Sequence, residues 1–320
     1  MRLTMPLKIA GAVALGAGLT AYARYRWEIA QRIEEVETGG TVALTHAGAI
    51  EYAQAGEGDP LLMIHGAGGG YDQGLMVGRD FGQGFRIIAP SRFGYLGTAL
   101  PDDASVSAQV EAHAALLDHL GIDKCVVTGV SAGAPSALEF ALRYPERTAA
   151  LILLVPRAYD PAQSIGPDRG ADSQMILRLV HASADFLFWL ATKVARSAVV
   201  RFLGVRPELE ANAPIAERAR ITEMMRSILP LSRRVRGIEA DSKTIIAPWP
   251  LEQLRVPTLI VSAEDDLYRT LPRARYTAER LPGCELKILA SGGHLMLGQG
   301  AQVSKAIRDF LKRTGGATSA

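Results

Sequence analysis

The sequence predicts an α/β fold, in which a mostly parallel sheet of about eight strands is covered by helices on both faces. Short apolar runs alternate with longer stretches of helical periodicity along most of the chain. The alternation stops between Pro156 and Pro257 and then resumes. Glycine-rich or polar segments follow several of the apolar runs, which is typical of a functional edge where parallel strands end.

The first two apolar runs alternate in polarity and flank turn residues around Gly48, so they predict an initial hairpin. The later runs are short and continuously apolar, the pattern of strands buried on both faces. The expected strands are 41–45, 50–54, 61–64, 85–89, 125–128, 151–155, 258–261 and 286–289. Apolar residues at helical spacing, with Gly121 and Pro145 as end signals, predict helices between them. The expected helices are 106–120, 132–144, 271–281 and 301–312.

Residues 157–256 contain no clear strand, and we expect them to form an all-helical cap inserted after the sixth strand. Long helical patterns cover 173–203 and 215–235. The chain is thereby divided into an N-terminal segment with its linker at 1–40, a core at 41–156 and 257–320, and the cap. The aromatic and leucine side chains of the cap either contact an apolar substrate or pack the cap onto the core.

The composition is that of an ordinary globular protein of 320 residues, with 48% hydrophobic and 21% charged residues and a mean hydropathy of +0.11. The net charge of +2 gives no indication of nucleic-acid binding. Cys125 and Cys284 lie far apart, so neither a disulfide framework nor a thiolate metal site is expected, and no cofactor is implied. Arginine outnumbers lysine, which suggests a GC-rich bacterial gene.

The uncharged stretch 9–23, between Lys8 and Arg24, predicts a single N-terminal membrane anchor, with the bacterial cytoplasmic membrane as the expected location and the side undetermined. Its length of about 22 Å is short of the roughly 30 Å hydrocarbon core. Two alternatives stay open: a signal peptide cleaved after Ala-Tyr-Ala at 21–23, and a soluble helix packed on the body. A short amphipathic helix over 24–37 is expected as a spacer.

Ser131 lies within Gly-Val-Ser-Ala-Gly at 129–133, between an expected strand and an expected helix. A serine on so tight a turn presents its hydroxyl above the sheet, and glycines flank it because the backbone passes close on both sides. The five-residue pattern is weak alone, and the strand before and helix after make it specific. Ser131 is the expected nucleophile, the alternative being an incidental serine in a glycine-rich turn.

The segment His-Gly-Ala-Gly-Gly-Gly at 65–70 follows the expected strand 61–64. Such a loop can direct backbone N–H groups at a developing oxyanion, which predicts a hole formed by the N–H of Ala67 or Gly68 together with that of Ala132. The competing interpretation, a dinucleotide-binding loop, lacks the full glycine pattern and the acid that such loops require.

A serine nucleophile needs a general base, and the base needs a carboxylate that holds its tautomer. His294 follows the last expected strand, and Asp265 and Asp266 follow the strand before it, in the chain order known for such sheets. The other five of the six histidines are interpreted as packed or solvated.

These motifs resemble those of serine-nucleophile α/β-hydrolases with a helical cap, including membrane-anchored bacterial members, over about residues 41–313. The resemblance implies that Asp266, three residues after Ala263, is the acid of the triad, with Asp265 as the fallback. At 90–95 the chain has Pro-Ser-Arg-Phe-Gly-Tyr where the family has Asp-x-Arg-Gly-x-Gly, so Ser91 replaces the acid.

The resemblance also implies a carboxylesterase- or lipase-like enzyme that cleaves an ester-like bond of a small apolar substrate through an acyl-enzyme. A serine at position 131 disfavours the branches whose aspartate forms an alkyl ester. C–C bond hydrolysis, acyl transfer and perhydrolysis on the same triad stay open. So does a non-catalytic ligand-binding role, because the fold does not determine the function.

Overall fold

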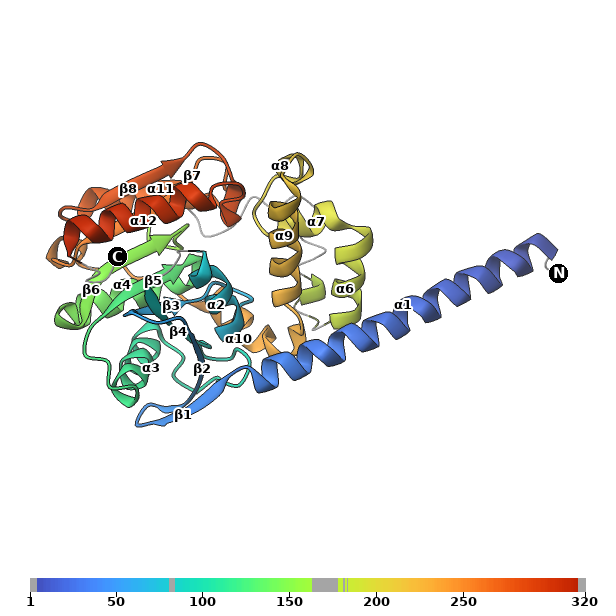
Figure 1. The fold of residues 1–320 in the computed structure, drawn as a ribbon, viewed down its shortest axis with the longest axis horizontal. Helices are drawn as coiled ribbons and strands as arrows, with labels where there is room; N and C mark the ends of the chain where they lie inside the picture. The colour runs from blue at the N-terminus through green and yellow to red at the C-terminus, as the bar shows by residue number, and fades with distance from the viewer. Residues whose placement is uncertain (1–4, 81–83, 163–177, 181, 183, 316–320) are drawn as a thin grey trace.

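A single eight-stranded sheet, with strand order β1-β2-β4-β3-β5-β6-β7-β8, forms the centre of the molecule (Figure 1). The computed structural model describes residues 5–80, 84–162, 178–180, 182 and 184–315, and for residues 5–15 only the course of the backbone. β2 pairs antiparallel with β1 and β4, and the other neighbours pair in parallel, which confirms the predicted sheet. The strands are β1 (Thr41–Thr45), β2 (Gly48–Ala55), β3 (Asp59–Ile64), β4 (Phe85–Pro90), β5 (Cys125–Val130), β6 (Thr148–Leu154), β7 (Thr258–Ala263) and β8 (Glu285–Leu289).

Both faces of the sheet are covered by helices. Side chains alternate along each central strand, so one strand contributes to the core on both faces. Leu61 and Met63 of β3 belong to the core on one face, and Leu62 and Ile64 belong to the core on the other. The first face is covered by α2 (Tyr71–Arg79) and α12 (Gly300–Thr314). The second is covered by α3 (Val106–His119), α4 (Ala134–Arg143) and α11 (Thr270–Arg280). The predicted two-sided arrangement is confirmed.

The described residues between β6 and β7 form helices and contribute no strand to the sheet, as predicted for an insertion after the sixth strand. We call helices α6–α10, with their connections from 184 to 244, the cap. They are α6 (Asp185–Val194), α7 (Arg196–Phe202), α8 (Pro207–Ala211), α9 (Ile215–Ser227) and α10 (Val235–Lys243). Residues 173–177 of the predicted helical pattern lie outside the described residues. Short 3₁₀ turns are η1 (Ser131–Gly133), η2 (Pro145–Arg147), η3 (Leu231–Arg233), η4 (Leu251–Gln253) and η5 (Gly293–Leu295).

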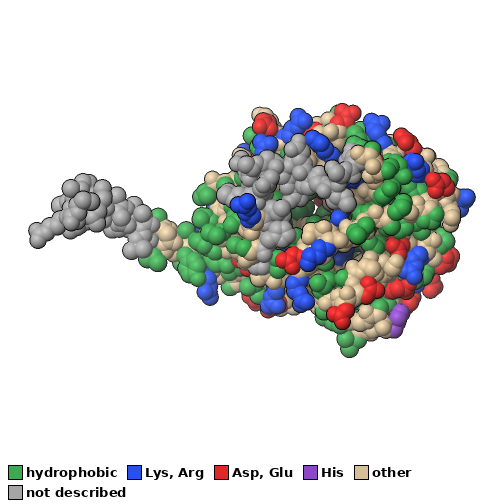
Figure 2. All heavy atoms as spheres, turned by 180° about the vertical axis from the view of Figure 1, so that it is seen from behind, with side chains coloured by type: hydrophobic (Ala, Val, Ile, Leu, Met, Phe, Trp, Pro, Cys, Tyr) green, Lys and Arg blue, Asp and Glu red, His purple; other side chains and the backbone are tan. Residues whose placement is uncertain are grey.

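Helix α1 (Met5–Thr38) has 34 residues; its first half extends away from the body, and its second half packs on the cap (Figure 1). The ring of Tyr25 lies 5.1 Å from that of Phe186 and 5.8 Å from that of Trp189, both in α6. The indole Nε1 of Trp189 donates a hydrogen bond to Glu28 Oε2 at 2.6 Å. Hydrophobic side chains gather where the helix joins the body (Figure 2). The segment 24–37 is helical, as predicted, but it forms the second half of a longer helix and packs on the cap rather than acting as a spacer.

The predicted membrane anchor over 9–23 is contradicted by the described part of the chain, in which no helix is both long and apolar enough to cross a bilayer. Helix α1 has the length, but Arg24, Arg26 and Glu28 follow the apolar stretch directly. That stretch spans only about 22 Å, against a hydrocarbon core of roughly 30 Å. The side chains of residues 9–15 lie outside the described residues. The predicted location, a single span in the bacterial cytoplasmic membrane, is contradicted by the same finding.

Candidate active site

Ser131 sits at a sharp turn between β5 and α4, with a φ of +49° that residues other than glycine seldom adopt. The turn requires glycine on both sides. A Cβ on Gly129 would lie 2.6 Å from Ala137 Cβ, and one on Gly133 would lie 2.5 Å from the carbonyl oxygen of Ile64. Because these two positions are glycines, α4 and β3 can pack closely against the turn, and the serine lies at the carboxyl end of β5.

His294 lies between Ser131 and Asp266. Its Nε2 is 2.8 Å from Ser131 Oγ, and its Nδ1 is 2.9 Å from Asp266 Oδ2. The three residues lie at the carboxyl end of the sheet, since they follow β5, β7 and β8. The structure thus assembles, within hydrogen-bond distance, the nucleophile, base and acid expected from the sequence.

The Asp266 carboxylate is fully buried and accepts further hydrogen bonds from Thr270 Oγ1 and from the amide of Tyr268 at 2.8 Å. Burial by itself would raise the pKa of Asp266, but the neighbouring His294 and these hydrogen bonds outweigh burial and hold the pKa below its ordinary value. Asp266 is therefore ionised at neutral pH and can hold the Nδ1 proton of His294.

Asp265, the fallback acid, faces a different partner. Its carboxylate accepts hydrogen bonds from the amides of Gly292 at 3.3 Å and Gly293 at 2.8 Å. These two glycines immediately precede His294. The structure thus places Asp266 beside the imidazole and Asp265 beside the backbone of the loop that carries it.

The glycine-rich loop after β3 lies against the serine, since a Cβ on Gly66 would be 3.3 Å from Ser131 Cβ. The amide of Gly68 donates to the hydroxyl of Tyr95 at 3.4 Å. The amides of Ala67 and Ala132 donate to no residue that the structure describes. Of the three expected oxyanion donors, Ala67 and Ala132 therefore have no acceptor among the described residues, whereas the N–H of Gly68 donates to Tyr95.

The cap reaches the site at Gly204, just after α7. The carbonyl oxygen of Gly204 accepts hydrogen bonds from the amides of His294 at 3.0 Å and Leu267 at 3.2 Å. The ring of Tyr268 stacks obliquely on the imidazole of His294, with 4.5 Å between centroids. Ile228, also from the cap, lies against Gly68. The cap thus both covers the site and fixes the loops that carry its acid and base.

Glu51 of β2 is a residue that the motifs did not indicate. Ser91, at the position where the family has an acid, donates its hydroxyl to Glu51 Oε2 at 2.7 Å. The amide of Gly97 donates to the same oxygen at 3.0 Å. Burial raises the pKa of Glu51. A carboxylate is therefore present at this place, supplied by a neighbouring strand, and no local pattern could have revealed a partner 40 residues away.

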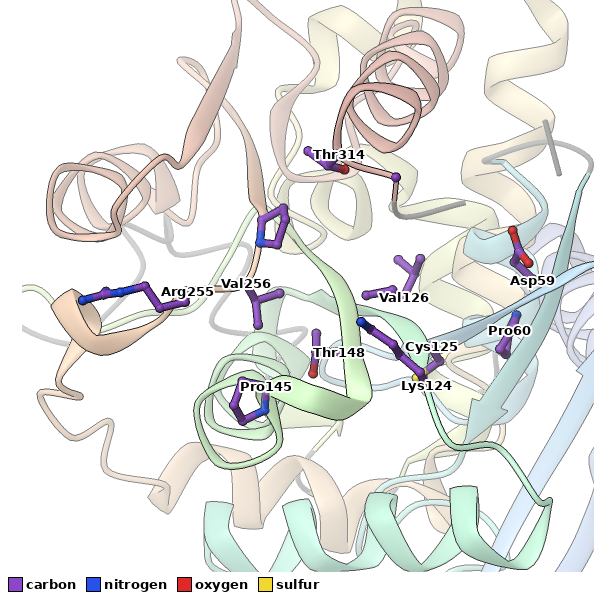
Figure 3. A pocket seen from close by; sticks show the side chains of 13 residues that line it. Asp59, Pro60, Lys124, Cys125, Val126, Pro145, Thr148, Arg255, Val256 and Thr314 are labelled. Atoms are coloured by element: carbon purple, nitrogen blue, oxygen red, sulfur yellow. The ribbon is translucent and has the colours of Figure 1, made fainter. Parts of the chain in front are cut away.

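A cavity of about 560 Å³ lies at the opposite end of the strands (Figure 3). It is lined by residues near the amino ends of β3, β5, β6 and β7, among them Pro60, Lys124, Thr148 and Val256. None of the expected site residues lines it. Size alone therefore does not mark the candidate active site, which is identified by its side-chain chemistry.

Known proteins resemble the chain over most of its length. It is 26% identical over 276 residues to the uncharacterized hydrolase YcgS of Bacillus subtilis, covering 83% of this chain and 95% of that protein. It is 35% identical over 113 residues to the 2-hydroxy-6-oxo-6-phenylhexa-2,4-dienoate hydrolase of Burkholderia cepacia, covering 33% of this chain and 40% of that protein.

Among solved structures, an alpha/beta hydrolase fold protein from Nakamurella multipartita superposes with a TM-score of 0.65 at 26% identity, covering 87% of this chain and all (100%) of that one. An esterase from Exiguobacterium antarcticum shares the fold, with a TM-score of 0.62 at 20% identity over 85% of this chain and 99% of that one. The family model for alpha/beta hydrolases matches residues 61–306, which contain the turn of Ser131, the glycine-rich loop and His294. The chain therefore belongs to the alpha/beta hydrolase family.

Proposed function

We propose that the protein is a serine hydrolase that cleaves an ester bond of a small acyl substrate. The observation that carries this proposal is the position of His294, with one ring nitrogen 2.8 Å from Ser131 Oγ and the other 2.9 Å from Asp266 Oδ2. This is the arrangement in which a serine hydroxyl can be deprotonated as it attacks a carbonyl carbon.

In the first half-reaction, Ser131 Oγ forms a bond to the carbonyl carbon while its proton moves to His294 Nε2. Asp266 keeps the imidazole in the tautomer that carries its proton on Nδ1 and stabilises the imidazolium. The amides of Ala67 and Ala132 donate to the carbonyl oxygen as its negative charge develops. The ester C–O bond then breaks, and the leaving oxygen takes the proton from Nε2.

In the second half-reaction, water attacks the acyl-enzyme and gives a proton to the same Nε2. The bond to Ser131 Oγ breaks, the serine regains its proton, and the acid leaves.

The region 157–256 acts as the substrate-covering unit in this proposal. Ile228, against Gly68, and the nearby Met224 give the cap an apolar surface toward the loop. This surface supports a substrate with an apolar acyl body.

Labelling with a fluorophosphonate probe tests the nucleophile directly. We expect the folded protein to be labelled, Ser131→Ala to lose the label, and both Ser131→Ala and His294→Ala to lose nearly all turnover of aryl esters. Ser107→Ala, which changes an exposed serine of α3, is the matched control. Absence of labelling in the folded wild type, or activity within a few-fold of wild type in either site variant, would contradict the proposal.

C–C bond hydrolysis is the second candidate. It is favoured by the similarity to 2-hydroxy-6-oxo-6-phenylhexa-2,4-dienoate hydrolase, which covers one third (33%) of this chain and 40% of that enzyme. Assaying a vinylogous 1,5-diketone acid beside an aryl ester of similar size separates the two. A kcat/KM for the diketone above that for the ester would reassign the reaction while leaving the triad in place.

A further inference from the structure

A small recess opens beside Ala132, between the cap and the core. It is about 30 Å³ in volume. That is roughly twice the minimum space for one water molecule, so the recess admits a small polar group. Polar groups from four separate elements line it: Arg92 after β4, Gln109 of α3, Arg157 after β6 and Asp241 of α10. Ala132, which directly follows Ser131 and carries an expected oxyanion donor, is one of the lining residues, so the recess lies next to the turn of the serine.

Arg157 is fixed next to the nucleophile. Its amide donates to the carbonyl oxygen of Ser131 at 3.0 Å. Its guanidinium donates to two backbone carbonyl oxygens of the cap, those of Asp241 and, at 2.9 Å, Thr244. These acceptors are neutral, and no described carboxylate forms an ion pair with Arg157. Among the described residues, Arg157 therefore has no ion-pair partner for the positive charge that it brings to the recess.

The negative charge of Asp241, whose carboxylate lines the recess, is balanced by Arg92. Its two oxygens accept hydrogen bonds from Nη1 and Nη2 of Arg92, each at 2.7 Å. The hydroxyl of Tyr95 donates to it as well, at 2.5 Å. Arg92 and Asp241 thus form a closed pair, and the charges that line the recess sum to one positive charge, that of Arg157.

The histidines behind the recess do not change this balance. Burial lowers the pKa of His113 to about 3, and burial together with Arg92 lowers the pKa of His65 well below its usual range, so both rings are neutral. Burial also lowers the pKa of Arg157; Arg92 and Arg273 lower it further, and Asp241 offsets only part of this. An anion in the recess would relieve this unfavourable placement of cations.

Gln109 provides a hydrogen-bond donor for such an anion. The side chain is buried, with 6% of its surface exposed, and its Oε1 accepts a hydrogen bond from the amide of Phe93 at 2.8 Å. Its Nε2 donates to no described residue and is not fully buried, and the side chain is one of those that line the recess. An accessible amide donor of this kind can donate to a water molecule or to a ligand.

We propose that this recess binds a carboxylate group of the substrate, held by the guanidinium of Arg157 and the amide Nε2 of Gln109. The inference rests on the proposed function, because it assigns a substrate class to the same site. The substrate is then an ester with an apolar acyl body and one acidic substituent, and the enzyme discriminates in favour of the acidic ester.

Two pairs of esters test the proposal, one for each side of the scissile bond. The first pair is p-nitrophenyl hexanoate and the p-nitrophenyl half-ester of adipic acid, which differ only in a terminal carboxylate. The second pair is phenyl hexanoate and 4-carboxyphenyl hexanoate. The measured quantity is the ratio of kcat/KM for the acidic ester to kcat/KM for the neutral one.

Gln109→Glu keeps an oxygen for the amide of Phe93 and replaces the free donor by a negative charge, and Arg157→Met removes the guanidinium. We expect the ratio in one pair to fall about ten-fold or more in each variant, chiefly through KM for the acidic ester. The control Arg236→Met removes an exposed charge from the same cap helix as Asp241 and leaves the ratio unchanged.

If Gln109→Glu leaves the ratio of kcat/KM for the acidic ester to that for the neutral ester unchanged in both ester pairs, the inference is wrong. This holds even if Arg157→Met does not fold. This failure is distinguishable from failure of the proposed function. If the neutral ester is hydrolysed in a reaction that depends on Ser131 while the ratio does not move, only the carboxylate subsite is wrong. If the wild type hydrolyses none of the four esters, the esterase function itself is wrong.

Discussion

Arg234 and Asp72 form a buried ion pair that joins the cap to helix α2, with Nη2 of the arginine 2.8 Å from Oδ2 of the aspartate. The side chain of Arg234 is completely enclosed, and its Nη1 also donates to the carbonyl oxygen of Gly69 at 2.5 Å. Arg32 of α1 binds the same aspartate from the other side. The pair of Asp72 and Arg234 therefore connects α1, α2, the cap and the loop that carries Ala67.

Replacing Arg234 should affect both stability and turnover. Arg234→Met removes the hydrogen bond to Gly69 and one of the two arginines that balance the negative charge of Asp72. We therefore expect a loss of about 3 kcal/mol or more in the free energy of unfolding. We also expect a lower kcat, because the loop of Ala67 loses its anchor. Urea denaturation and ester kinetics measure the two effects. Arg233→Met, which removes an exposed arginine paired with Glu37, should leave both close to wild type.

The stability contributed by Asp72 should depend on pH. Burial would raise the pKa of Asp72, but Arg234 and Arg32 outweigh burial and lower it. A carboxyl with a depressed pKa in the folded state stabilises the fold above its ordinary pKa, and the contribution disappears as the pH falls through the folded value. Asp72→Asn should therefore be least stable relative to wild type at pH 7, and the difference should shrink below about pH 4. A difference that is constant from pH 7 to pH 3 would refute this.

Asp265 and Asp266 should be separable by kinetics. Asp266→Asn removes the acceptor of the His294 Nδ1 proton, and kcat should fall on the order of 10³- to 10⁴-fold. Asp265→Asn leaves an oxygen that can still accept from Gly293, so its loss of kcat should stay within about ten-fold. Equal losses in the two variants would mean that the assignment of the acid to Asp266 is incorrect.

Shortening the chain tests the role of α1. A chain that begins at Thr41 loses Tyr25, Glu28 and Arg32, and thereby exposes Trp189 and leaves one side of Asp72 unpaired. We expect a lower melting temperature and a lower kcat/KM for aryl esters. A chain that begins at Gly16 keeps all of these contacts and should behave as the full-length protein does. Indistinguishable melting curves for the two shortened chains would show that the packing of α1 contributes nothing.

The sequence predicts which residues lie together at the candidate site, because each of them closely follows a strand. Ser131, Asp266 and His294 stand in local patterns of glycine, strand and turn, and a parallel sheet brings such segments to one edge. The eight strands are predictable as well, since alternating polarity marks β1 and β2, and continuous apolar runs mark the later strands, which are buried on both faces.

The remaining features depend on pairs that are far apart in the sequence. Glu51 meets Ser91 at a separation of 40 residues, and Arg234 meets Asp72 at a separation of 162. No periodicity connects such residues, because each appears locally as an ordinary charge on a strand or loop. The packing of α1 also depends on distant partners, since Phe186 and Trp189 lie in the cap. The hydropathy of 9–23 therefore favours a membrane anchor and leaves a helix packed on the body as an alternative.

The contact of Gly204 with the catalytic loops limits how caps can be exchanged among members of this family. A Cβ at this position would lie 2.5 Å from His294 Cβ and 2.4 Å from the ring of Tyr268, and the φ of +78° excludes most other residues on conformational grounds as well. A chimera that grafts a foreign cap onto this core must therefore retain a glycine turn here. Otherwise it would displace His294 while leaving Ser131, Asp266 and His294 unchanged in the sequence.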